Sequence, residues 1–116
     1  MSHDLPSDTE MRIIAVMSRA GGKEMMAPEI VRQDRDQKLS ENSIYVLLTR
    51  AVARGFLAAR KETPEEKSRS KSRGPRRVLF TLTGYGQQQY DARVAAERAA
   101  ARQMVKGGFV KPVGAL

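Results

Sequence analysis

Large apolar side chains recur at helical spacing near the start of the chain, between residues 11 and 17. The preceding letters SDTE have the spacing of a capping box, with Ser7 at the N-cap and Glu10 three residues later. Two glycines at 21–22 supply the backbone freedom that a helix end uses. The pattern predicts a first helix over residues 8–20.

A second, shorter helix is predicted where the letters APEIVRQ begin. Pro28 suits the first helical turn, where its missing N–H costs nothing, and Glu29 lies near the positive end of the helix dipole. We expect this helix to end near Arg35. The letters DRDQK then predict a polar connection.

The next segment has the clearest periodicity, and Ser40 is its expected N-cap. Gly55 lies where a helix C-cap glycine belongs. Five apolar residues form a stripe at i, i+3, i+4, i+7 and i+8: Ile44, Leu47, Leu48, Ala51 and Val52. The opposite face carries Asn42, Ser43, Val46, Thr49 and Arg50, with Tyr45 at its edge.

Two interpretations of this third helix remain open. An ordinary amphipathic core helix explains the apolar stripe completely. The small polar side chains at its N-terminal end also suit a helix that enters a DNA major groove. Helix, polar connection, helix is the order of a helix-turn-helix.

Two short segments with partial alternation follow, and they predict a hairpin in which residues 56–62 pair with residues 76–81. The thirteen residues between them, 63–75, are rich in Lys, Arg, Ser and Pro. Such a segment buries little apolar surface, so we expect a mobile loop. It is either a solvated loop or the basic wing of a winged helix, whose arginines would contact phosphates beside the groove.

The net charge of +8 is concentrated in this hairpin region. Residues 1–59 contain eight acidic and eight basic residues. Residues 60–77 contain eight basic and three acidic residues, a net charge of +5. A basic patch on one segment is typical of a protein that binds a polyanion.

A last helix is predicted over residues 84–106, with Thr83 as its N-cap. Tyr90, Val94, Ala101 and Met104 recur along one side and form a candidate seam. The helix either packs on its own domain or forms a dimer contact. We favour the dimer, because a small domain leaves little core to cover the seam. Residues 107–116 are expected to form a flexible tail.

Catalytic and metal chemistry find no support in the sequence. There is no cysteine, and the one histidine, His3, is near the terminus. Neither a P-loop nor a Gly-x-Ser-x-Gly motif is present. We therefore expect a protein without catalytic residues, metal ligands or cofactor. Without a membrane-length apolar run or a signal peptide, we also expect it in the cytoplasm.

Two motifs resemble the PadR-like family of winged-helix transcriptional regulators. The letters LSENSIYVLLTRAVARGFL, residues 39–57, are similar to that family's recognition helix, and GPRRVLFTLTGYG, residues 74–86, to its wing. Together the motifs cover about half of the chain. The resemblance implies a DNA-binding regulator that dimerises through its last helix.

We therefore expect a mainly α protein with a small β-hairpin: a winged helix-turn-helix domain over residues 1–83, followed by the dimerisation helix. The predicted function is sequence-specific binding of double-stranded DNA at a palindromic operator, as a homodimeric regulator that acts as a repressor; a small-molecule effector is left open. The alternative is a winged-helix module that binds RNA or a protein partner. The predicted DNA contacts are Ser40, Asn42, Ser43, Tyr45, Thr49, Arg50, Lys67, Arg69, Lys71, Arg73, Arg76 and Arg77.

Overall fold

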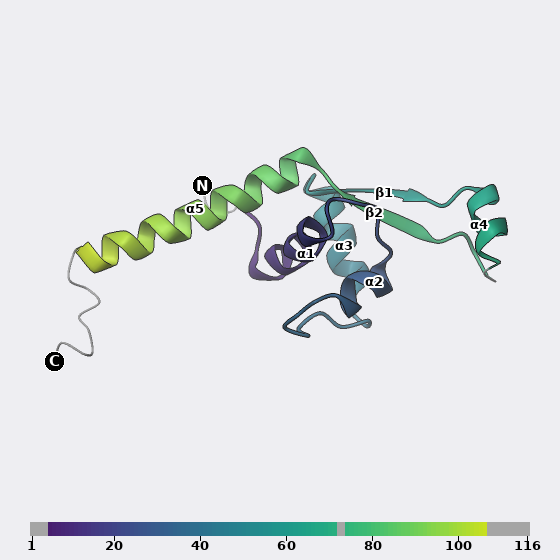
Figure 1. Cartoon of the computed structure of the whole chain (residues 1–116), viewed down its shortest axis with the longest axis horizontal. Coiled ribbons are helices and arrows are strands. Elements are labelled where there is room, and N and C mark those ends of the chain that lie inside the picture. The colour runs from purple at the N-terminus through teal and green to yellow at the C-terminus, as the bar shows by residue number, and fades with distance from the viewer. Residues whose placement is uncertain (1–4, 72–73, 107–116) are drawn as a thin grey trace.

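The computed structural model of the chain describes residues 5–71 and 74–106. The fold is mainly helical with a small antiparallel hairpin, as the sequence predicts (Figure 1). Its elements, in chain order, are α1 (Asp8–Arg19), α2 (Ala27–Arg32), α3 (Ile44–Ala53), β1 (Leu57–Lys61), α4 (Pro64–Ser70), β2 (Val78–Leu82) and α5 (Gly84–Lys106).

The core lies where the first three helices meet the base of the hairpin (Figure 1). Ile13 and Met17 of α1, Ile30 of α2, Leu48 of α3 and Phe80 of β2 are all buried there. Burying side chains of this kind stabilises the fold by about 1.5–3 kcal/mol each, as an upper estimate. The apolar stripe of α3 therefore packs inward, and its polar face is turned outward.

Helix α1 begins as the capping box predicts. The N–H of Glu10 donates to the Ser7 hydroxyl at 3.2 Å, and the N–H of Ser7 donates to the Glu10 carboxylate at 2.8 Å. The Glu10 side chain is buried and also accepts from the guanidinium of Arg54, which follows α3. The cap of α1 is thus joined to the end of α3.

Helix α2 begins at the predicted position but ends at Arg32, three residues earlier than expected. Asp34 explains the early end. Its buried carboxylate accepts the backbone N–H groups of Lys38 at 2.6 Å and Leu39 at 2.9 Å, with a longer contact to Asp36 at 3.3 Å. A side chain that satisfies the backbone of a turn competes with helix continuation. The connection to α3 is therefore an ordered loop.

Helix α3 begins at Ile44, and the prediction that Ser40 is its N-cap is wrong. Residues 41–43 form a turn, in which the N–H groups of Ser43 and Ile44 donate to the Ser40 carbonyl. The Ser40 and Ser43 hydroxyls lie 2.9 Å apart and bond to each other instead of to the helix. The predicted C-cap is confirmed, since Gly55 has a φ of 84° and the next N–H donates to the Ala51 carbonyl.

The predicted hairpin pairing is confirmed, with strand ends shifted by one or two residues. Leu57 pairs with Leu82 and Lys61 pairs with Val78. Met25, in the segment between α1 and α2, forms an isolated antiparallel bridge with Phe80 on the other side of β2. This bridge, which the sequence did not predict, attaches the hairpin to the α1–α2 segment.

The segment between the strands, predicted as a loop, contains the helix α4 (Figure 1). Thr63 and Glu66 form a second capping box, and Pro64 occupies the first turn. The helix has no buried residue. Its formation therefore rests on local hydrogen bonds, which a burial argument overlooks.

Helix α5 begins with the predicted cap. The Thr83 hydroxyl accepts the N–H of Gly86 at 2.9 Å and donates to the Gly55 carbonyl at 2.7 Å. The rings of Phe56 and Tyr85 stack with centroids 5.7 Å apart. Beyond its first turns the helix runs away from the core, on the side opposite to the hairpin (Figure 1).

Across the described residues, no helix combines the length and apolarity that crossing a membrane requires.

Candidate nucleic-acid interface

The outward face of α3 is open to solvent. Tyr45 and Val46 are 57% and 60% exposed, and Thr49 and Arg50 are also exposed. Together with Ala53 these side chains line a shallow groove of about 510 Å³. The predicted reading face is therefore exposed along the length of the helix.

The turn before α3 presents the smaller predicted contacts. Asn42 is exposed, and its side chain is available to an external partner. Ser40 and Ser43 are exposed as well, but their hydroxyls share the hydrogen bond described above. The hydroxyl that donates keeps two acceptor lone pairs, and the one that accepts keeps its O–H and one lone pair, for an external group.

A second groove, of about 610 Å³, joins segments that are far apart in the sequence. The start of α2 contributes Pro28, and its end contributes Arg32. Tyr45 comes from α3, and Arg76 and Arg77 come from the segment that leads into β2. Tyr45 lines both grooves, so the two meet at this side chain.

The two adjacent arginines in this groove differ in their partners. Arg77 donates through its backbone N–H and its guanidinium to the buried carboxylate of Glu62, at 3.0–3.3 Å. The Arg77 side chain and then its backbone N–H hold the pKa of Glu62 below its ordinary value. Arg76 is exposed and forms no ion pair with any described residue. Of the two, Arg76 presents the uncompensated charge.

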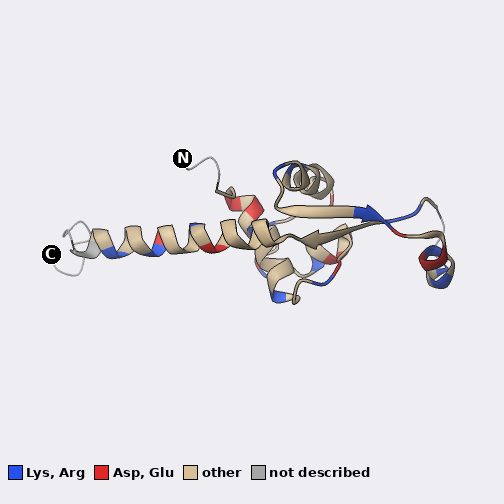
Figure 2. Ribbon diagram, turned by 90° about the horizontal axis from the view of Figure 1, so that it is seen from above, with Lys and Arg blue, Asp and Glu red and all other residues tan. Residues whose placement is uncertain are grey.

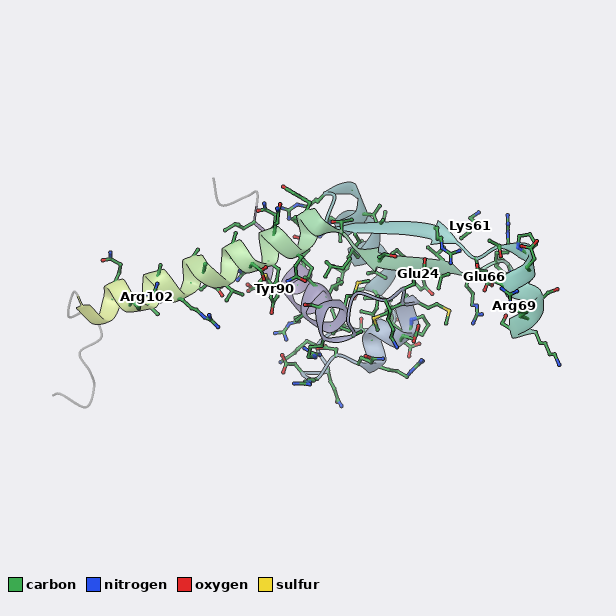
Figure 3. All side chains as sticks on the ribbon, turned by 45° about the horizontal axis from the view of Figure 1, so that its top comes forward. Glu24, Lys61, Glu66, Arg69, Tyr90 and Arg102 are labelled. Atoms are coloured by element: carbon green, nitrogen blue, oxygen red, sulfur yellow. The ribbon has the colours of Figure 1, made fainter. Side chains whose placement is uncertain are left out.

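A cluster of ion pairs holds α4 to the rest of the hairpin (Figure 3). The guanidinium of Arg60 contacts Glu24 at 2.6 and 2.8 Å and Glu66 at 2.9 Å on both oxygens. The Arg60 side chain, followed by the Thr63 N–H, lowers the pKa of Glu66 to about 2. Arg60 therefore links three segments, and its charge is compensated by carboxylates.

Of the predicted cations around α4, one is hydrogen-bonded within the chain and two are exposed. Lys67 donates to the Gly74 carbonyl. Arg69 and Lys71 are exposed at the end of α4 (Figure 3). Arg73 lies outside the described residues. Figure 2 shows that Lys and Arg gather from the end of β1 to the tip of the hairpin, with Glu65 and Glu66 interspersed on α4.

The residues of the candidate seam on α5 differ in their surroundings. Tyr90 is half-buried and packs against the core next to α1, so it is not without a partner as the prediction assumed (Figure 3). Val94 is half-exposed, and Ala101 and Met104 are exposed. Arg93 anchors this first part of α5, since it donates to the Pro6 carbonyl at 2.8 Å and pairs with Asp8.

Sequence reasoning missed two residues of this surface, Val46 and Arg32. Val46 lies on the predicted polar face but is not among the predicted DNA contacts. Arg32 was overlooked because the sequence does not show that the end of α2 meets the hairpin.

Among the residues that the structure describes, no cluster of His, Cys, Asp or Glu is arranged to hold a metal ion.

Comparisons with protein-family models, with curated protein sequences and with solved structures found no match to this chain.

Proposed function

We propose that this chain is a winged helix-turn-helix protein that binds double-stranded DNA and acts as a homodimeric transcriptional regulator, with repression as its mode. Helices α2 and α3 form the helix-turn-helix, and the segment β1–α4–β2 forms the wing. The motif resemblance to the PadR-like regulators supports the same assignment.

One observation carries the proposal: the groove on the outward face of α3 meets the groove at the base of the wing at Tyr45. A DNA-reading helix needs contacts to the phosphates that flank its groove, because these fix its register on the duplex. Here Tyr45 is shared between the face of α3 and the groove that contains Arg32 and Arg76. The side chains suited to bases and those suited to phosphates are thus adjacent.

The charge of this surface fits a polyanion. Within the described part of the chain, neither groove has an acidic side chain in its lining, whereas the cations Arg32, Arg50 and Arg76 are there; Arg77 also lines the second groove, but Glu62 compensates its charge. The glutamates of the wing that bind Arg60 and Arg77 lie outside this lining. A concave basic surface raises the local concentration of DNA and accelerates association.

The second half of α5 supports the homodimer. Every residue from Ala95 to Met104 is exposed, and the helix projects from the body in Figure 1. Ala101 and Met104 are the apolar residues of the candidate seam on this exposed part. Pairing with the same helix of a second copy would bury Ala101 and Met104 and place two reading helices on one duplex.

A gel-shift titration against random duplex DNA and against RNA, each at two salt concentrations, tests the binding class. We expect tighter binding to the duplex, with affinity that falls steeply as salt rises. Equal or stronger binding to RNA would overturn the proposal.

The variant Arg76→Ala sharpens the test, and Arg102→Ala is its matched control. Both remove one exposed arginine, but Arg102 lies on the far part of α5, away from the wing (Figure 3). Losing one phosphate contact reduces the slope of log affinity against log salt concentration by about 0.9 for each protein copy bound. We expect this reduction for Arg76→Ala and an unchanged slope for Arg102→Ala. Identical slopes in the two variants would remove Arg76 from the interface.

A further inference from the structure

The outward face of α3 carries an exposed apolar side chain in its first turn. Val46 is 60% exposed, and it lies between Tyr45 and the pair Thr49 and Arg50 in the shallow groove. A single exposed apolar residue is ordinary on a protein surface. The position of this one is informative, because its neighbours are the groups that a base-reading helix uses.

Val46 also lacks a structural role in the fold. It lies outside the core cluster and outside the apolar side chains packed against that cluster. A β-branched residue at an exposed helical site is less favourable than a straight-chain one, since it loses side-chain freedom. Neither packing nor helix propensity therefore accounts for valine here.

We infer that Val46 reads the 5-methyl group of a thymine in the major groove, so that an A·T base pair lies against the first turn of α3. This inference rests on the proposed function. The thymine methyl is the one apolar group that base pairs present in the major groove, and apolar side chains discriminate by contacting it.

The charges around Val46 select duplex DNA over an apolar protein partner. Arg50 is adjacent on the same face, and Arg32 and Arg76 line the groove that meets this one at Tyr45. A protein surface that covered Val46 would have to cover Arg50 as well and remove it from water. A major groove accepts both, because thymine methyl groups and the acceptors of guanine lie side by side in it.

The test replaces single thymines by deoxyuridine, which lacks the methyl group but keeps every hydrogen-bonding group. The full chain first selects its site from a random duplex pool. Affinities are then measured for the selected duplex and for duplexes with one thymine replaced at a time, using the wild type, Val46→Ala and the conservative Val46→Ile.

Each half-site should contain one thymine whose single replacement weakens wild-type binding about fourfold. This loss corresponds to one methyl group removed from an apolar contact. Val46→Ile should keep this sensitivity, and Val46→Ala should lose it. The inference is overturned if no replacement weakens binding, or if Val46→Ala keeps the same penalty. If the thymine inference fails in one of these ways but the pool is still enriched in one sequence, the proposed DNA-binding function stands. A pool without enrichment would overturn both the thymine inference and the proposed function.

Discussion

At the scale of single residues, the structure distinguishes side chains that look equivalent in the sequence. Arg76 and Arg77 are adjacent in a basic motif, and both were predicted to contact phosphates. Arg77 instead binds the buried carboxylate of Glu62, whereas Arg76 is exposed. The sequence could not separate them, because the partner is fifteen residues away and becomes a neighbour only through the strand register.

Asp34 shows the same limit. It belongs to a polar run that predicts a solvated connection, yet its carboxylate is buried and binds three backbone N–H groups. Burial alone would raise its pKa, but the bonds from Leu39, Lys38 and Asp36 outweigh this effect and hold the pKa below its ordinary value. Its stabilising effect is therefore complete above the unfolded-state pKa of about 3.9.

We predict that Asp34→Asn lowers the free energy of unfolding at pH 7 by about 1–3 kcal/mol, because buried N–H groups lose an acceptor. The difference from wild type should shrink as pH falls through the lowered pKa of Asp34, since the wild type then loses the same charge. Urea unfolding at pH 7 and near pH 3 measures both values. The control Asp36→Asn changes an exposed carboxylate that pairs with Arg12 and should have a smaller effect at pH 7. Equal losses in the two variants would contradict the role of Asp34.

At the scale of elements, the sequence predicted α1, the start of α2, the end of α3, the hairpin and the cap of α5. Each of these follows from local signals, namely caps, glycines and apolar periodicity. Helix α4 also had such a signal, because Thr63, Pro64 and Glu66 repeat the capping logic of α1. It was missed because the low apolar content of the segment was given more weight. The start of α3 was misplaced for another reason, since Ser40 bonds to Ser43 rather than to the helix.

Gly86 fixes how closely α5 approaches the end of α3. A Cβ at this position would lie 2.2 Å from the Phe56 carbonyl oxygen, which is backbone and cannot swing aside. We predict that Gly86→Ala destabilises the protein by about 1–3 kcal/mol despite the better helix propensity of alanine. Gly84→Ala is the control, because nothing lies within 4 Å of its Cβ position. Thermal unfolding of both variants is the measurement, and equal midpoints would contradict the close approach.

The wing depends on Arg60, which joins Glu24 to Glu66 of α4. Because the pKa of Glu66 is lowered to about 2, the stabilisation from this pair is present above the ordinary glutamate pKa and is lost as pH falls towards 2. We predict that Arg60→Ala raises the pKa of Glu66 towards its ordinary value, as an NMR titration of the carboxyl group would measure. Lys61→Ala removes the adjacent exposed cation and should leave that titration nearly unchanged. An unshifted Glu66 in Arg60→Ala would show that the pair does not hold α4.

At the scale of the whole molecule, α5 has two parts with different surroundings. Its first part is held to α1 by Tyr90 and Arg93, and its second part is exposed. The sequence pattern described one continuous seam, because helical spacing alone does not show which turns already contact the domain. The dimer contact, as proposed, is therefore carried by the part of the seam that begins near Val94.

We predict that a chain ending at Glu97 remains folded but is a monomer. It keeps Tyr90 and the Arg93–Glu97 pair, and it lacks Ala101 and Met104. Light scattering at tens of micromolar should give a dimer for the full chain and a monomer for the truncated chain, with similar thermal unfolding midpoints. A full chain that is a monomer under these conditions would remove the dimer from the proposal.

The proposed reading of DNA sequence by the face of α3 is tested by the ratio of affinities for a selected duplex and a random duplex at one fixed salt concentration. For the full chain we predict a ratio of at least about a thousandfold. The variant in which Asn42 and Ser43 are both alanine should lower that ratio at least about tenfold, because each base contact contributes about 1–3 kcal/mol of discrimination. A wild-type ratio near one, or the same ratio in the double variant, would contradict the proposal that α3 reads DNA sequence.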